Sequence, residues 1–136
     1  MQQMWDVVHA LDVRSKRMER TIGVTGPQRL VLRIVGQSPN KVASEIASTL
    51  GIHPSTLTGI LARLEQRGAL VREIDPEDRR RARFRLTAMG RKIDNLRKGT
   101  VEAAVRRSIA RAGDKVVERT VEMLGILAEE LSRIDE

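Results

Sequence analysis

The fold is decided by residues 51–87, which read GIHPSTLTGILARLEQRGALVREIDPEDRRRARFRLT. In the first half of this stretch, apolar residues such as Leu57 and Leu64 recur at helical spacing, so we expect a helix over residues 54–67. Gly68 is placed to end this helix, because glycine is the commonest residue just beyond a helix C-terminus. Beyond it, side chains alternate one by one, as they do in a strand. The stretch therefore predicts a helix followed by a short β structure.

The second half of the stretch has the pattern of a β-hairpin. Side chains alternate in direction along residues 70–74 and again along residues 82–86, where Phe84 lies on the apolar face. Between these segments, residues 75–78 (DPED) have the composition of a turn and lead into three consecutive arginines. We therefore expect two short strands joined by a charged tip, the structure known as a wing.

Two further helices are predicted upstream of this stretch. Thr25 and Gln28 form a capping-box pattern at the start of one helix, which we expect to end at Gly36. The other covers roughly residues 42–50, and Gly51 follows it at a position where a positive φ is often required. A short helix, a glycine turn and a second helix make a helix-turn-helix. The predicted fold class is mainly α, a winged helix-turn-helix with a two-stranded β wing and a helical dimerisation body.

Helices are also expected at both ends of the chain. Apolar residues recur along one face of residues 4–22 and again along residues 117–134. Thr87 is expected to cap a long helix that runs to about Ala112, and Gly113 separates it from the last helix. A four-helix core with a small wing cannot bury both apolar faces, so we expect a two-fold partner to cover them. The alternative is that these helices fold back onto their own subunit.

Size and charge agree with one small domain that carries a basic surface. The chain has 136 residues and a net charge of +7, and a single domain commonly has this length. Residues 54–92 hold ten Lys and Arg against five Asp and Glu, whereas residues 114–136 hold three against seven. Positive charge thus gathers on the predicted winged part, and basic surfaces attract the phosphate backbone of nucleic acids.

Several classes of function are disfavoured by the composition. The chain contains no cysteine, which excludes disulfides, thiolate zinc sites and cysteine nucleophiles. His9 and His53 are too few for a metal site, and we expect no cofactor. No Ser-His-Asp set, glycine-rich phosphate loop or pair of carboxylates in an apolar setting is evident, so we do not expect an enzyme. No apolar run is long enough to span a membrane and no signal peptide is evident, so the expected location is the cytoplasm.

The helix predicted over residues 54–67 begins with small polar residues on its outer side, which suits entry into the major groove of DNA. Hydroxyl groups there can bond to phosphates or base edges, and the free amides of the helix N-terminus point toward phosphate. The candidate DNA-binding residues of this helix are Pro54, Ser55, Thr56, Thr58, Gly59 and Arg63. The alternative for Ser55 and Thr56 is a purely structural role as helix caps.

The expected wing tip carries a second group of candidate DNA contacts. These are Arg79, Arg80 and Arg81, and Asp78 is expected to hold one of them in place by an ion pair. The other arginines are then free to reach a narrow minor groove, where negative potential is concentrated. A charged turn that only faces solvent is the alternative. The position of the hairpin directly after a helix-turn-helix favours the DNA-binding interpretation.

Four motifs in the chain resemble those of the multiple antibiotic resistance regulator (MarR) family. They are residues 52–58 (IHPSTLT), 64–73 (LEQRGALVRE), 75–80 (DPEDRR) and 84–90 (FRLTAMG). The resemblance covers the stretch from Thr25 to Gly90 by motif, and the helical flanks extend it over nearly the whole chain by pattern.

The resemblance implies roles for individual residues. Ser55, Thr56 and Thr58 match the contacts of the recognition helix. Arg79 and Arg80 match the wing motif, and Asp78 matches the acidic residue that steadies the wing; Arg81 is added to the candidates on the basis of its charge alone.

The resemblance also implies a homodimer that binds double-stranded DNA. One MarR-like domain, residues 1–136, is expected to comprise a winged DNA-binding region (24–90) and a helical dimerisation region (1–23 and 91–136). Each subunit presents one recognition helix to successive major grooves of a pseudo-palindromic operator, and the wings touch the flanking minor grooves. The expected function is a transcriptional regulator, a dimeric repressor. The alternative is a winged-helix adaptor that binds proteins or small ligands without a specific operator.

Members of this family often change their DNA affinity when a small aromatic or phenolic ligand lodges between the dimer body and the winged region. Trp5 and His9 lie one turn apart on the first predicted helix and are the candidates for such an effector site. A lone tryptophan more often serves packing, and a chain with 1% aromatic residues is not expected to build an aromatic-lined pocket. Sensing by thiol oxidation cannot operate in a chain without cysteine.

Overall fold

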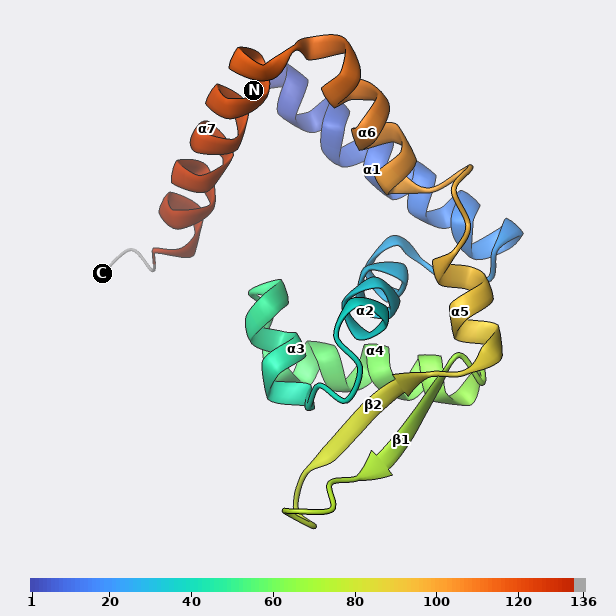
Figure 1. The fold of residues 1–136 in the computed structure, drawn as a ribbon. Helices are drawn as coiled ribbons and strands as arrows, with labels where there is room; N and C mark the ends of the chain where they lie inside the picture. Colours follow the sequence, from blue (N-terminus) through green and yellow to red (C-terminus); the bar gives the residue numbers. More distant parts are fainter. Residues whose placement is uncertain (134–136) are drawn as a thin grey trace. The chain divides into compact units, whose positions relative to one another are not determined.

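The computed structural model describes residues 1–133, and their path is drawn in Figure 1. In chain order the elements are α1 (Gln2–Thr21), α2 (Gly26–Gln37), α3 (Ala43–Leu50), α4 (Pro54–Gln66), β1 (Leu70–Ile74), β2 (Ala82–Leu86), α5 (Ala88–Asp94), α6 (Val101–Ala112) and α7 (Asp114–Ser132). The predicted fold class, mainly helical with a two-stranded wing, is confirmed. The chain divides into two compact units, Met1–Val101 and the residues from Glu102 onward.

The core of the first unit lies between α2, α3, α4 and the two strands. Aliphatic side chains dominate it, because Phe84 is its only aromatic residue in the described part of the chain. Its buried members are Val24, Val31, Leu32, Val35, Ile46, Ala47, Leu57, Leu61, Leu64, Ala69, Leu70, Phe84 and Ile93. The leucines of α4 therefore anchor that helix by one face and leave its opposite face toward solvent.

The helix α2 begins at the capping box that the sequence predicts. The backbone N–H of Gln28 donates to Oγ1 of Thr25 at 3.4 Å, and the backbone N–H of Thr25 donates to Oε1 of Gln28 at 3.0 Å. Gly36, expected to end the helix, lies inside it. A Cβ at this position would lie 2.8 Å from Oδ2 of Asp94, so the glycine is needed for close packing against α5 and not for helix termination.

The strands β1 and β2 pair antiparallel, with Leu70 opposite Leu86 and Ile74 opposite Ala82. The chain just before α3 extends this sheet by a single bridge from Val42 to Arg83. In Figure 1 the turn that joins the two strands projects beyond the helices of the first unit. The hairpin is thus attached to the helical core at its base and free at its tip.

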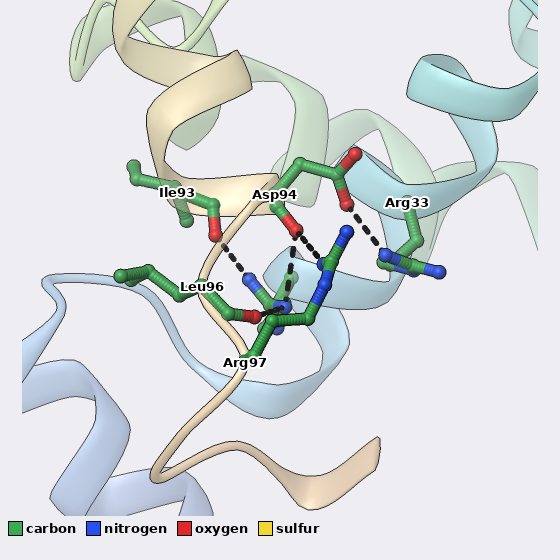
Figure 2. Close-up of polar contacts among 6 residues, drawn as sticks. Arg33, Ile93, Asp94, Leu96 and Arg97 are labelled. Carbon is green, nitrogen blue, oxygen red and sulfur yellow. Dashed lines mark hydrogen bonds and ion pairs between the residues drawn. The ribbon is translucent and has the colours of Figure 1, made fainter. Parts of the chain in front are cut away.

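The long helix expected over residues 87–112 is interrupted, which corrects the prediction. Thr87 does cap a helix, α5, but α5 ends at Asp94 and α6 begins only at Val101. The cause is Arg29, whose side chain is 2% exposed and donates to three carbonyl oxygens at and beyond the end of α5 (Figure 2).

These three carbonyls belong to Ile93, Asp94 (3.3 Å) and Leu96 (2.7 Å). Asp94 also forms an ion pair with Arg33 at 3.3 Å. The carbonyl groups that would carry the next helical turn are therefore bonded to a side chain from α2, and the backbone turns away. Helix α2 is far in sequence from the end of α5. A local sequence pattern therefore does not predict that the helix is interrupted there.

The second unit contains α7 and all of α6 except its first residue, Val101. Gly113, whose φ is +77, separates the two helices. No described residue of either helix is buried. Their exposed large apolar residues are Val105, Ile109, Val116, Val121, Met123, Leu124, Ile126 and Leu131. Ile134, predicted as the last residue of this apolar face, lies outside the described residues.

Along α1 the predicted apolar face is covered only toward its C-terminal end. Met18 is buried, whereas Met4, Val8 and Leu11 are exposed. Within residues 1–133, no helix is both long and apolar enough to cross a membrane.

Candidate nucleic-acid interface

The turn between α3 and α4 requires a glycine. Gly51 has φ +62 and ψ +31, the left-handed conformation, as the sequence predicts. A residue with a Cβ is disfavoured in this conformation by roughly 1–2 kcal/mol. The next amide, of Ile52, donates to the carbonyl oxygen of Ala47 at 3.2 Å and so closes the end of α3. The turn therefore fixes how α4 leaves α3.

The N-cap of α4 is His53, a role that the sequence analysis did not assign to it. Its Nδ1 accepts a hydrogen bond from the backbone N–H of Ser55 at 3.2 Å, and Oγ of Ser55 lies 2.7 Å from the same nitrogen. The alternative interpretation of Ser55 and Thr56 as the caps is therefore wrong. Pro54 was the available signal, because proline favours the first helical position and the N-cap then lies one residue earlier.

The outer face of α4 is open to solvent. Ser55, Thr56 and Gly59 are exposed, and a Cβ built on Gly59 would meet no atom within 4 Å. Packing within the described part of the chain therefore does not require this glycine, although glycine weakens a helix by about 1 kcal/mol relative to alanine. Its absent side chain leaves the backbone of α4 accessible to a large molecule.

Two candidate DNA-binding residues on α4, Thr58 and Arg63, are less available to a ligand than the sequence suggests. Oγ1 of Thr58 donates to the carbonyl oxygen of Pro54 at 2.9 Å, so its lone pairs and methyl group are what remain for a ligand. Arg63 lies on the flank of α4 that faces the turn between α1 and α2, where it lines a hollow with Gly23 and Gln28. It is thus set apart from the other candidates of this helix.

At its base, the wing is held by Asp75, which sequence reasoning assigned only to a turn. Asp75 is 5% exposed. Its Oδ1 accepts from the backbone N–H of Glu77 at 2.9 Å, and its Oδ2 accepts from Nε of Arg83 at 2.8 Å. The backbone N–H of Asp75 in turn donates to the carbonyl oxygen of Arg81 at 3.0 Å. One carboxylate thereby ties the turn to the opposite strand.

These bonds keep both members of the ion pair charged. The backbone N–H of Glu77 and then the side chain of Arg83 lower the pKa of Asp75 below its ordinary value, and burial opposes them only in part. The hydrogen bond to Asp75 raises the pKa of Arg83 in the same way. The base of the wing therefore contains a permanent ion pair at neutral pH.

Asp78 steadies the wing by a different contact from the one predicted. Its Oδ1 accepts from the backbone N–H of Arg80 at 3.0 Å, and its carbonyl oxygen accepts from the N–H of Arg81 at 2.9 Å. Within residues 1–133, the expected ion pair between Asp78 and an arginine side chain is not formed. A short aspartate at the start of a turn reaches the backbone two residues on more readily than a distant guanidinium.

Residues 79–81, all arginine, form the exposed tip of the wing. Their guanidinium groups have no hydrogen bond or ion pair with any residue that the structure describes. Nearer the base, by contrast, Arg83 pairs with Asp75 and Arg85 pairs with Glu73. The tip therefore carries three unpaired cations that are available to a ligand.

A hollow of about 560 Å³ between α3, α4 and the wing joins the two groups of candidates. Thr58 lines it from α4, and Arg80 and Arg81 line it from the wing tip. Thr58 and these two arginines of the wing tip therefore face the same side of the first unit. Arg72 of β1 also lines this hollow and was missed; its signal was a basic residue within the predicted wing.

The candidates for an effector site lie on α1. Trp5 is 65% exposed and His9 is also exposed. Their role in binding a small ligand stays a prediction.

Known proteins share both the sequence of the winged region and the fold. The profile of the MarR family matches residues 24–82. The HTH-type transcriptional repressor Rv2887 of Mycobacterium tuberculosis is 32% identical over 90 residues, which is 66% of this chain and 65% of that protein. Over residues 24–82, the chain is thus similar to the MarR family. The matched segment thus spans just under two thirds of the repressor's length.

Solved structures extend the likeness in fold to nearly all of the chain. Staphylococcus aureus MepR in complex with DNA has a TM-score of 0.81 at 18% identity and covers 96% of each chain. PcaV of Streptomyces coelicolor in complex with its natural ligand has a TM-score of 0.78 at 22% identity, over 93% of this chain and 89% of PcaV. At these identities the likeness is one of fold.

Proposed function

We propose that this chain is a MarR-family, sequence-specific DNA-binding transcriptional regulator that acts as a dimeric repressor on a pseudo-palindromic operator. One observation carries the proposal. Thr58 of α4 and Arg80 and Arg81 of the wing tip border the same hollow, on one side of the winged unit. A duplex placed there meets both at once.

The chemistry of the two elements suits the two grooves of DNA. The exposed start of α4 is small enough to enter the major groove, where Ser55 and Thr56 can bond to base edges or phosphates. The wing tip, residues 79–81, offers guanidinium groups to the adjacent minor groove, where a narrow groove concentrates negative potential. Pro54, Thr58, Gly59 and Arg63 complete the proposed contacts of α4.

The relatives support this proposal. Rv2887 is named a transcriptional repressor, and MepR, which has the same fold, has been crystallised with DNA. In the proposal, residues 24–90 form the DNA-binding region, and residues 1–23 and 91–136 form the dimerisation region.

A homodimer is proposed because large apolar surfaces remain uncovered in the single chain. Trp5 and Val8 on α1, and Val121 and Leu124 on α7, are each at least half exposed. Many exposed apolar side chains along one helix are a liability on a monomer, and a second copy can bury them in a symmetric dimer.

Dimerisation can be tested by sedimentation equilibrium of the full chain and of a Leu124→Glu variant. We expect a dimer for the full chain and a shift toward monomer for the variant, because a carboxylate buried in an apolar interface is strongly unfavourable. Removal of the residues after Asp114 is expected to abolish the dimer. A monomeric full chain at micromolar concentration that still retarded full operators would contradict this part of the proposal.

The DNA-binding proposal is tested by gel retardation with the intergenic DNA upstream of the gene. We expect retardation of that fragment to exceed retardation of an unrelated fragment of equal length and to weaken steeply with salt. Equal, weak retardation of every fragment would instead support the adaptor considered from the sequence.

Three further parts of the proposal follow from the family. We propose that a small ligand modulates the complex, since PcaV of the same fold binds its natural ligand, and titration of the protein–operator complex with small aromatic acids tests this. A regulator of this kind has no catalytic step, so we expect no enzymatic activity. Contact with chromosomal DNA requires a cytoplasmic location.

A further inference from the structure

Two of the three exposed hydroxyl groups near the start of α4 have a hydrogen-bond partner within the chain. The three belong to Ser55, Thr56 and Thr58. Oγ of Ser55 lies 2.7 Å from Nδ1 of His53. Oγ1 of Thr58 donates to the carbonyl oxygen of Pro54 at 2.9 Å. The direction of these two hydrogen bonds determines which groups of a nucleic acid each hydroxyl can bind.

The hydrogen bonds of His53 fix the tautomer of its imidazole ring. Nδ1 accepts from the backbone N–H of Ser55 at 3.2 Å, so this nitrogen carries no proton. A neutral imidazole then has its single proton on Nε2. Because Nδ1 is an acceptor, the hydroxyl of Ser55 is the donor in the contact of 2.7 Å. His53 therefore fixes the direction in which the hydroxyl proton of Ser55 points.

The hydroxyl groups of Ser55 and Thr58 can then only accept further hydrogen bonds. Each keeps oxygen lone pairs for a ligand but has no second proton to donate. Phosphate oxygens are acceptors as well, so they are not partners for these two hydroxyls. The donors that bases present in the major groove are the exocyclic amino groups of adenine and cytosine. The two hydroxyls are therefore suited to bind base amino groups.

We propose that His53 is a positioning residue for DNA recognition, because it makes Ser55 an acceptor for an exocyclic amino group of adenine or cytosine. Thr58 has the same polarity through its own bond to a backbone carbonyl. The inference rests on the proposed function and narrows it, since Ser55 binds a base edge and not a phosphate. Thr56, whose Oγ1 has no hydrogen bond among residues 1–133, is left to donate to phosphates.

The surroundings of Ser55 allow a base edge to come close to its short side chain. Leu57 is 1% exposed and Leu61 is 4% exposed, so rotation of α4 about its axis would uncover core side chains. Gly59 lies one turn beyond Ser55, and a Cβ there would meet no atom within 4 Å. The lone pairs of Ser55 thus face a surface that no neighbouring side chain of α4 covers at this point.

The tautomer is tested without DNA, by nitrogen NMR of the full chain at about pH 8, where an ordinary imidazole is neutral. We expect a protonated Nε2 and an unprotonated Nδ1 for His53. The spectrum of His53→Asn identifies the signals, because His9 is then the only histidine left in the chain. A ring with its proton on Nδ1 would overturn the inference, whatever DNA the chain binds.

The recognition of a base amino group is tested by gel retardation with base analogues. In the duplex that the chain retards specifically, purine replaces each adenine in turn and pyrimidinone replaces each cytosine, so that only the amino group is lost. We expect affinity to fall about tenfold for at least one position in each half-site. A loss at adenine or at cytosine identifies the base. For Ser55→Ala, the same replacement should have no further effect, because the contact is already absent.

Two variants of His53 separate positioning from helix capping. His53→Asn keeps an acceptor for both groups of Ser55, so the tenfold discrimination should remain. His53→Gly retains a residue that is tolerated at an N-cap but removes the acceptor. The hydroxyl of Ser55 can then also donate, so discrimination should fall to about twofold or less. Thr49→Val, which removes a hydroxyl bonded to the carbonyl oxygen of Glu45 on α3, is the matched control with unchanged discrimination.

Two results would overturn the inference and leave the proposed function intact. One is specific retardation that no loss of an amino group weakens. The other is equal discrimination by His53→Gly and the unaltered chain, which would show that His53 only caps the helix. Equal, weak retardation of every fragment would instead contradict the proposed function, and the recognition of base amino groups with it.

Discussion

The base and the tip of the wing are built from the same residue type with opposite results. At the base, Arg83 and Arg85 are paired with Asp75 and Glu73 across the two strands. At the tip, residues 79–81 have no side-chain partner within the described structure. The arginines of the base contribute to the fold of the hairpin, whereas those of the tip remain available to the proposed DNA ligand. A count of charges cannot separate these two roles, because only the position of the carboxylates decides them.

The largest effect is expected from replacing Phe84, the residue that anchors the base of the wing in the core. Phe84 is 4% exposed and packs in the core of the winged unit. Phe84→Ala should lower the free energy of unfolding by about 3–5 kcal/mol, the usual cost of such a cavity. Chemical denaturation monitored by circular dichroism measures it. A loss below about 1 kcal/mol would mean that the wing is not anchored through this residue.

Removing the positive charges of the wing tip should lower operator affinity and leave the stability of the fold almost unchanged. The double variant Arg79→Ala/Arg80→Ala is expected to weaken operator binding about tenfold or more. It should reduce the slope of log affinity against log salt by about 1–2. The free energy of unfolding should change by less than about 0.5 kcal/mol, since neither side chain has a partner among residues 1–133.

Arg83→Ala is the matched control for the tip variant, because it removes one arginine from the same hairpin. It leaves the carboxylate of Asp75 without its ion pair, so we expect lower thermal stability in addition to any change in affinity. If the tip variant destabilises the fold as much as Arg83→Ala does, the distinction between base and tip is wrong.

On the helix beside the tip, Gly59→Ala should move stability and affinity in opposite directions. Alanine is favoured over glycine inside a helix by about 0.5–1 kcal/mol, and a Cβ here meets no atom within 4 Å, so the fold should become more stable. The added methyl group stands where the duplex is proposed to approach, so operator affinity should fall. Titrations in parallel with denaturation measure both. The reciprocal variant Ala62→Gly, on the same exposed side, should lower stability by a similar amount.

The smallest effect is expected from pH, which changes the stability of the fold through Asp75 at the base of the wing. The pKa of Asp75 is lowered in the folded chain by the N–H of Glu77 and by Arg83, so folding favours its ionised form. This contribution is complete above the unfolded pKa of about 3.9 and is lost as the pH falls through the lower folded value. Unfolding curves between about pH 5 and pH 3 should therefore show a loss of stability that Asp75→Asn lacks. Equal pH dependence of both proteins would exclude this role of Asp75.

Much of the fold was predictable because its signals are local. The switch from helical to alternating spacing around Gly68 predicted α4 and both strands, and the capping box of Thr25 and Gln28 predicted the start of α2. The left-handed turn at Gly51 was predicted from the residue type alone. In each case the information lies within a few consecutive residues, as the geometry of helices and turns requires.

The candidate site was predictable only in part. The sequence singled out the hydroxyl-bearing start of α4 and the arginine tip, but not His53 as the N-cap or Asp75 as the residue that holds the wing. It assigned an ion pair to Asp78, which bonds to the backbone instead. Several acidic residues crowd into one turn, and a sequence does not show which carboxylate faces a guanidinium.

By itself, the sequence determined the order of helices and strands, the glycine of the helix-turn-helix and the charge of the wing, because these depend on spacing and composition along the chain. Only the tertiary structure decided that α5 ends at Asp94 and which arginines are paired. The reason is distance along the chain: the guanidinium group that ends α5 comes from Arg29, more than sixty residues away. Contacts of that range form only once α2 and α5 pack together.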